Sequence, residues 1–111
     1  MVPHIRPAQL AEWLGQAGST AVVLDVREPH EHQTASVQAH GFELVLMPMA
    51  TVPARLVDLP KDRPIACLCH HGGRSAQVAY FLHNQGYTQV VNIHGGIDAW
   101  STEVDPTVPR Y

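Results

Sequence analysis

Four short apolar runs, separated by segments with helical patterns, are the feature that most constrains the fold of this chain. The runs lie at residues 21–26, 44–47, 65–68 and 89–93. Short runs in which apolar residues predominate are typical of strands that are buried on both faces. Strands that alternate with helices indicate a parallel sheet. The sequence therefore predicts an α/β fold in which helices flank a parallel sheet on both faces.

The segments between the apolar runs carry the signals of helices. We expect helices at residues 7–16, 29–38, 53–59, 75–85 and 97–101. The pattern is clearest at 75–85, because Ser75 is suited to cap that helix and Gly86 to end it. In the last helix we expect Trp100 to be a core residue and Asp98 to be a cap or turn residue.

Length and charge limit the domain organisation and the partners. The 111 residues predict one domain spanning 1–111, with a core of about 5–101 and an extended surface tail at 102–111. A net charge of −3 without a long run of one sign argues against nucleic-acid or membrane partners. No apolar run approaches the ~20 residues that span a bilayer, and the first residues lack an apolar signal-peptide core. We therefore expect a cytoplasmic protein.

One run joins the third predicted strand to the clearest helix, and we name it the Cys69 loop (residues 69–75). It consists of Cys69, His70, His71, Gly72, Gly73, Arg74 and Ser75. A thiol at this junction faces the positive end of a helix, which favours the nucleophilic thiolate. The two glycines lack Cβ atoms and allow several N–H groups to converge on one point. The pattern predicts Cys69 as a nucleophile rather than as a small core residue.

The helix end by itself stabilises an anion by only ~0.3–1 kcal/mol when exposed and up to ~2 kcal/mol when partly buried. We therefore expect the loop amides and the Arg74 cation to contribute as well. His70 and His71 would add positive potential when they are protonated. These considerations make residues 70–75 candidate binding residues around Cys69.

Other interpretations of the same segment carry less weight. Cys67 lies inside an apolar run, so we expect a core residue, with a resolving thiol as the alternative. A disulfide with Cys69 is disfavoured, because side chains alternate faces along a strand. Cys67, Cys69, His70 and His71 are all possible metal ligands, but near-consecutive residues do not easily surround a tetrahedral ion. We expect no metal.

Asp25 and Arg27 follow the apolar run at 21–26 and should lie near the Cys69 loop. The reason is that sites in parallel sheets form at the carboxyl ends of strands. The pair could frame the mouth of a pocket, or it could form an ion pair that closes the end of the strand. We favour the ion pair.

Four motifs in this order and spacing resemble those of a single-domain rhodanese. They lie at residues 25–31, 65–69, 69–75 and 95–100. The resemblance covers about residues 5–100 and implies a five-stranded parallel sheet flanked by helices. It also implies that Cys69 takes a sulfane sulfur from a small donor, thiosulfate or a persulfide, and passes it to cyanide or a protein thiol. N–H groups of residues 70–74 would hold the persulfide, Arg74 would favour an anionic donor, and no cofactor would be needed.

Two other functions use the same cysteine. Cysteine-dependent phosphatases and arsenate reductases place five residues between the cysteine and an arginine, whereas four separate Cys69 from Arg74. The shorter loop suits a sulfur atom better than a phosphate. The chain could also be a non-catalytic module that carries sulfur or binds a partner. The sequence does not separate such a carrier from an enzyme, because both need Cys69.

Overall fold

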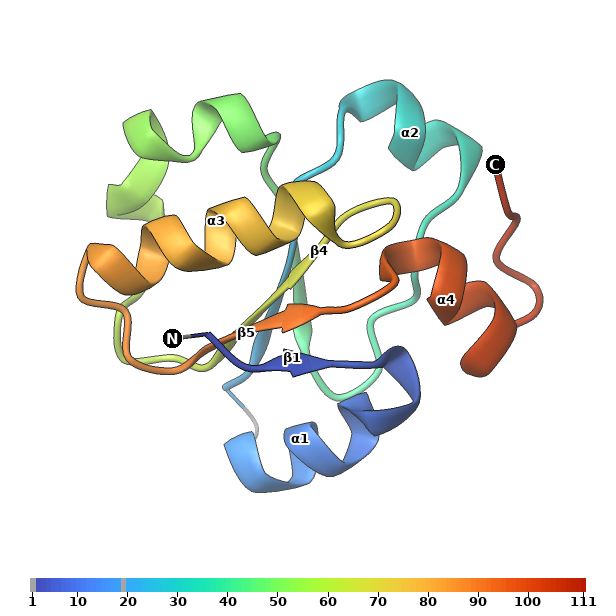
Figure 1. Cartoon of the computed structure of the whole chain (residues 1–111), viewed down its shortest axis with the longest axis horizontal. Coiled ribbons are helices and arrows are strands. Elements are labelled where there is room, and N and C mark those ends of the chain that lie inside the picture. The colour runs from blue at the N-terminus through green and yellow to red at the C-terminus, as the bar shows by residue number, and fades with distance from the viewer. Residues whose placement is uncertain (1, 19) are drawn as a thin grey trace.

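A five-stranded parallel sheet forms the centre of the protein (Figure 1). This computed structural model describes residues 2–18 and 20–111. The strands are β1 (His4–Ile5), β2 (Val22–Asp25), β3 (Glu43–Leu46), β4 (Ile65–Leu68) and β5 (Val90–Ile93). Their order is β1-β5-β4-β2-β3, and each neighbouring pair is parallel. The predicted α/β fold is confirmed. The apolar pattern did not reveal β1, because two residues are too few to show a periodicity.

The helices follow the predicted segments with small shifts at their ends. They are α1 (Leu10–Ala17), α2 (Pro29–Thr34), α3 (Gly73–Asn84) and α4 (Gly96–Glu103). Three short 3-10 helices lie at Pro7–Gln9, Met49–Thr51 and Pro53–Asp58. The helix expected at 53–59 is thus a 3-10 helix, and it is interrupted at Arg55, where φ is −113°.

Two separate hydrophobic cores cover the two faces of the sheet. Successive side chains of a strand point to opposite faces. In β4, Ile65 and Cys67 therefore belong to the core under α3, whereas Ala66 and Leu68 belong to the core that Trp100 of α4 shares with α1. Figure 1 shows α3 on one side of the sheet and α1 on the other. This double cover explains why the residues of β2, β4 and β5 are all buried.

The C-terminal segment after α4 lies mostly at the surface and is anchored by one buried residue. After α4 the chain turns, and Val108 is buried in the core that contains Trp100. The Ser101 hydroxyl donates to the Val108 carbonyl oxygen at 2.6 Å. The segment ends beside α2 (Figure 1). Burial of the apolar Val108 thus holds this surface segment against the domain.

No helix within residues 2–18 and 20–111 combines the length and the apolar character that crossing a membrane requires.

Candidate functional site

Cys69 lies directly after β4, and its sulfur is held from two sides. The residue is 1% exposed. The Gly72 N–H donates to Sγ at 3.0 Å, and the Ser75 hydroxyl lies 3.3 Å from the same atom. The thiol therefore occupies the junction between β4 and α3 that the sequence indicated, with one amide and one hydroxyl on its sulfur.

Ser75 contacts Cys69 but does not cap α3, so that part of the prediction is wrong. The helix begins at Gly73, and Gly72 precedes it with φ at +107°. This left-handed turn starts the helix two residues before Ser75, whose side chain is then fully buried. Its hydroxyl donates to Asn92 Oδ1 at 2.6 Å. Since a hydroxyl has one hydrogen, Ser75 can donate to Asn92 or to the Cys69 sulfur, but not to both at once.

The first turn of α4 forms hydrogen bonds with two carbonyl oxygens of the Cys69 loop. The Cys69 carbonyl oxygen accepts from the Ile97 N–H at 2.8 Å, and the His70 carbonyl oxygen accepts from the Asp98 N–H at 3.1 Å. In a trans peptide the C=O and N–H bonds point in opposite directions. The N–H groups of His70 and His71 therefore point away from α4.

Several amides of the loop are free to bind an anion. No acceptor among residues 2–18 and 20–111 pairs with the N–H of His70, His71, Gly73 or Arg74. The last two are at the start of α3, where N–H groups have no partner inside the helix. These donors lie next to the Gly72 amide that contacts Sγ, so the loop offers unpaired N–H groups for a sulfur anion.

The glycine pair before α4 allows this close approach. A Cβ on Gly96 would lie 2.4 Å from the Cys69 carbonyl oxygen and 2.5 Å from that of His70. A Cβ on Gly95 would lie 2.6 Å from the Cβ of Ala99. Both glycines also have positive φ. Any larger residue at Gly96 would push α4 off the loop. The N-cap of α4 is Gly95, so of the two predicted positions, cap or turn, Asp98 occupies the first turn of the helix, where it forms an ion pair with Arg110 at 2.9 Å.

Arg74 is paired with Glu31, a residue to which the sequence analysis gave no role. Two hydrogen bonds of 2.7 and 2.8 Å join the guanidinium of Arg74 to the carboxylate of Glu31. Arg74 holds the pKa of Glu31 well below its usual range. The pair is neutral overall, and the expected role of Arg74 in binding an anionic donor stays a prediction. Glu31 is the last residue of the motif at 25–31. Its place in that motif was the sequence feature that could have indicated a role in the site.

Asp25 and Arg27 form a buried ion pair at the end of β2. Arg27 Nη2 lies 2.7 Å from Asp25 Oδ2, and both side chains are 0% exposed. The interpretation as an ion pair that closes a strand end is confirmed. Their role in framing a pocket stays a prediction.

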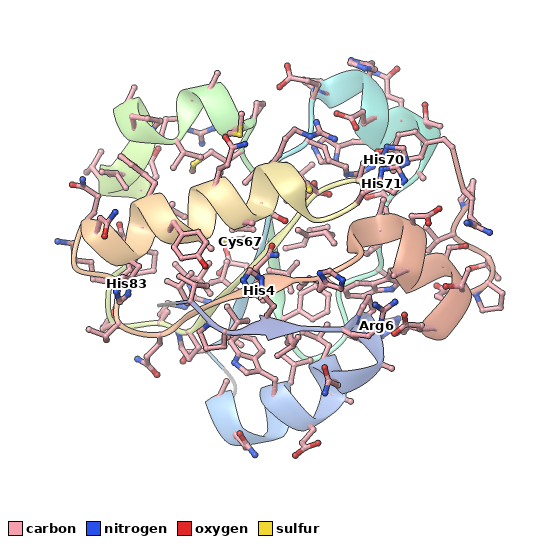
Figure 2. The ribbon with its side chains drawn as sticks, in the orientation of Figure 1. His4, Arg6, Cys67, His70, His71 and His83 are labelled. Carbon is pink, nitrogen blue, oxygen red and sulfur yellow. The ribbon has the colours of Figure 1, made fainter. Side chains whose placement is uncertain are left out.

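Cys67 lies in the core under α3, as predicted (Figure 2). It is 0% exposed, and burial raises the pKa of its thiol far above the ordinary value. The thiol therefore stays protonated, which makes it unsuited to nucleophilic attack.

His70, His71 and Tyr111 form a stack of rings against the Cys69 loop. The ring centroids of His70 and His71 are 3.9 Å apart, and those of His70 and Tyr111 are also 3.9 Å apart. Figure 2 shows the two histidines between α2 and α4. Tyr111 was missed by the sequence analysis, as was Asn92, which contacts Ser75. Neither carries a local pattern that indicates a site.

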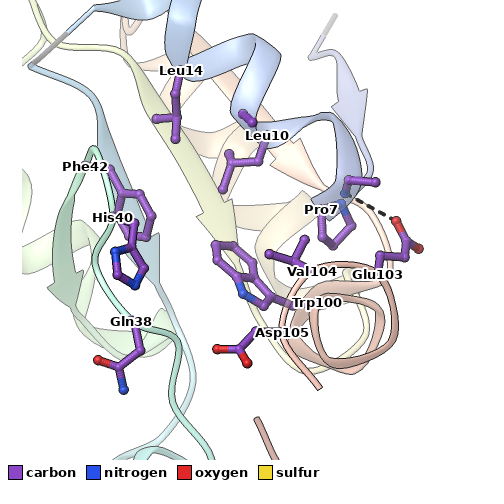
Figure 3. Close-up of a pocket in the computed structure, with 12 residues that line it drawn as sticks. Pro7, Leu10, Leu14, Gln38, His40, Phe42, Trp100, Glu103, Val104 and Asp105 are labelled. Carbon is purple, nitrogen blue, oxygen red and sulfur yellow. Dashed lines mark hydrogen bonds between the residues drawn. The ribbon is translucent and has the colours of Figure 1, made fainter. Parts of the chain in front are cut away.

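A cavity of about 590 Å³ lies elsewhere, between α1, α4 and the segment before β3 (Figure 3). Apolar side chains such as Leu10, Leu14, Phe42 and Trp100 line much of it. None of its lining residues belongs to the Cys69 loop.

The sheet and the cysteine at its strand-to-helix junction define an α/β protein with a candidate thiol nucleophile. The profile of the rhodanese-like domain matches residues 6–103, and the chain belongs to that family. Its relatives include proteins named as sulfurtransferases.

Three comparisons illustrate this relationship. A protein of Allochromatium vinosum named sulfurtransferase is 33% identical over 108 residues, which cover 97% of this chain and 96% of that protein. The chloroplastic rhodanese-like/PpiC domain-containing protein 12 of Arabidopsis thaliana is 43% identical over 93 residues, 82% of this chain but 30% of that protein. The crystal structure of a rhodanese-related protein from Thermoplasma volcanium has a TM-score of 0.79 at 32% identity, covering 98% of this chain and 99% of that one. The chain thus spans nearly all of the first relative and less than a third of the second.

Proposed function

We propose that this protein is a sulfurtransferase that carries a sulfane sulfur as a persulfide on Cys69. The observation that carries the proposal is the Gly72 N–H on Sγ, in a loop whose neighbouring amides have no acceptor among the described residues. Preorganised N–H groups of this kind stabilise charge that develops on a reacting atom. The name of the Allochromatium vinosum relative supports the same class of reaction.

The reaction proceeds in two displacements with thiosulfate as the donor. The Cys69 thiolate attacks the outer sulfur of thiosulfate, a new S–S bond forms, and sulfite leaves with the electron pair of the broken S–S bond. The anionic outer sulfur of the persulfide is then held by the loop amides. An acceptor, either cyanide or a protein thiolate, attacks this sulfur, and the electron pair of the Sγ–S bond returns to Cys69. Cyanide leaves as thiocyanate, and a thiolate acceptor becomes a persulfide.

Intact-mass spectrometry after thiosulfate treatment tests the persulfide. The wild-type protein should gain about 32 Da, the mass of one sulfur atom, and lose it on addition of cyanide or dithiothreitol. Cys69→Ala should gain nothing and release no thiocyanate from thiosulfate and cyanide. Cys67→Ala is the matched control and should load and turn over like the wild type, because Cys67 is buried in the core. A wild-type protein that never gains the sulfur would refute both an enzyme and a carrier.

The rate at which the loaded protein loses its sulfur separates an enzyme from a carrier. A sulfurtransferase should pass the sulfur to cyanide in a step fast enough to sustain turnover with thiosulfate in excess. A loaded protein that releases sulfur only stoichiometrically would show that Cys69 stores sulfur for another protein.

A further inference from the structure

The segment after α4 is attached to the domain at three points and ends at the Cys69 loop. Val108 is buried, the Arg110 guanidinium pairs with Asp98 at 2.9 Å, and Tyr111 lies against His70. Successive anchors fix the course of this segment from α4 toward α2 (Figure 1). The segment is therefore part of the surroundings of the site.

The Tyr111 hydroxyl joins two charged residues beside the site. It accepts from Arg27 Nη1 at 2.9 Å and donates to Glu31 Oε1 at 2.8 Å. Burial raises the pKa of Tyr111, so the phenol keeps the proton that it donates. Glu31 is the carboxylate that holds Arg74, and Arg27 is fully buried. The hydroxyl is thus fixed by groups that are themselves held in place.

The Tyr111 ring covers one face of His70, the residue that follows Cys69. The two rings are 5° from parallel at 3.9 Å, and His71 packs on His70 at 27° and 3.9 Å. Tyr111 is 38% exposed, so one part of its side chain faces solvent while the other contacts the loop. The ring therefore lies where solvent and the loop meet.

From these contacts we propose that Tyr111 is a specificity-determining residue, which holds His70 in place and restricts the site to small sulfur donors. Cys69 is 1% exposed, so a donor that reaches Sγ has little room beyond its terminal sulfur. Removal of the ring would free the face of His70 and widen the approach to the loop. The inference rests on the proposed function, because donor selectivity requires that Cys69 accepts sulfur.

Two donors of equal charge and different size test the proposal: methanethiosulfonate and benzenethiosulfonate. In each case the Cys69 thiolate attacks the terminal sulfur, an S–S bond forms, and a sulfinate leaves with the electron pair of the broken bond. We expect the wild type to favour the methyl donor. Tyr111→Ala should raise the ratio of kcat/KM for the phenyl donor over the methyl donor roughly 10-fold, the scale at which pockets discriminate by size.

Two further substitutions distinguish the effect of losing the Tyr111 ring from the effect of losing its hydroxyl and from a general loss of stability. Tyr111→Phe keeps the ring and should leave the ratio close to that of the wild type. Tyr80→Ala removes a tyrosine of similar exposure, 42%, whose ring contacts His4 rather than the loop, and should also leave the ratio unchanged. A general loss of stability would lower both rates together and would not move the ratio.

The outcomes distinguish this inference from the proposed function. If the wild type gains no sulfur from thiosulfate, the proposed function fails. If the wild type reacts and Tyr111→Ala keeps the wild-type ratio, the role of Tyr111 is refuted. Should the alanine variant not fold, Tyr111→Val removes the ring and most of its bulk but keeps a short apolar side chain. An unchanged ratio in that variant would refute the role equally.

Discussion

At the scale of single residues, the hydrogen-bond partners of the Cys69 sulfur decide its chemistry. Ser75 is fully buried, and its single hydroxyl hydrogen can point to Asn92 Oδ1, at 2.6 Å, to Sγ, at 3.3 Å, or to the Gly72 carbonyl oxygen, at 3.3 Å. A neutral thiol can donate its own proton to Ser75, whereas a thiolate can only accept. Formation of the thiolate therefore favours rotation of the hydroxyl toward sulfur.

Ser75→Ala should slow the transfer of sulfur to Cys69. Hydrogen bonds to charged groups contribute about 1.5–3 kcal/mol, so we expect a loss of roughly 10- to 100-fold in the rate of persulfide formation. Stopped reactions followed by intact mass measure that rate. Thr34→Ala is the matched control, since its hydroxyl donates to the His30 carbonyl oxygen on exposed α2. Equal rates in Ser75→Ala and the wild type would show that the hydroxyl does not assist the sulfur.

At the scale of elements, the approach of α4 to the Cys69 loop shapes the site. The N–H groups of Ile97 and Asp98 in this helix donate to the carbonyl oxygens of Cys69 and His70. This arrangement turns the opposite N–H groups of those peptides away from α4. The start of α4 thus orients the peptide groups that follow Cys69.

Gly96→Ala should disrupt this arrangement. The added Cβ would lie 2.4 Å from the Cys69 carbonyl oxygen, at a residue whose φ is +59°. We expect a loss of at least about 1–3 kcal/mol in the free energy of unfolding, together with reduced persulfide formation. Urea unfolding and intact mass are the two measurements.

Gly15→Ala is the matched control for that substitution. Gly15 lies within α1, and nothing lies within 4 Å of an added Cβ. It should stabilise the protein by roughly 0.5–1 kcal/mol, because alanine is the better helix former. If Gly96→Ala were as stable and as active as Gly15→Ala, the close packing of α4 on the loop would be shown to contribute neither to stability nor to persulfide formation.

At the scale of the whole molecule, Glu31 connects three parts of the chain. Its carboxylate accepts from Arg74 of α3, from Tyr111 in the C-terminal segment and from the Glu28 N–H at the start of α2. The pKa of Glu31 lies well below its usual range, mainly because of Arg74. The unfolded chain therefore binds a proton at Glu31 more readily than the folded protein does.

This difference predicts how stability depends on pH. The contribution of Glu31 is present above about pH 4.3, the usual value for an unfolded glutamate, and is lost as the pH falls toward the lower folded pKa. The gap in unfolding free energy between the wild type and Glu31→Gln should shrink below that pH by up to ~1.4 kcal/mol per pH unit. Urea unfolding from pH 7 to pH 2.5 measures it.

A second glutamate provides the comparison for this pH series. Glu12 is exposed on α1, and Glu12→Gln is the matched glutamate substitution, unfolded in urea over the same pH range. A gap for Glu31→Gln that does not change with pH would contradict the linkage between Glu31 and acid stability.

The comparison of sequence with structure shows which features depend on local patterns. The apolar runs at 21–26 and 65–68 predicted two buried strands, and the Cys69 loop appears at the predicted junction. In contrast, β1 has only two residues, which are too few to show a pattern. Ser75 was predicted to be a helix cap, because serine is a favoured residue at the N-cap position of a helix. The left-handed Gly72 moved the start of α3 and left Ser75 free to contact Cys69.

The sequence by itself determined the alternation of strands and helices and the place of Cys69 between them, because these features depend on residues close together in the chain. Only the tertiary structure decided which side chains surround that cysteine. Arg74 meets Glu31 across 43 positions, and Tyr111 meets Glu31 across 80. Such contacts arise where packed elements converge at the ends of parallel strands, and no local pattern encodes them. This is why Arg74 is paired with Glu31 and why Tyr111 lies against His70.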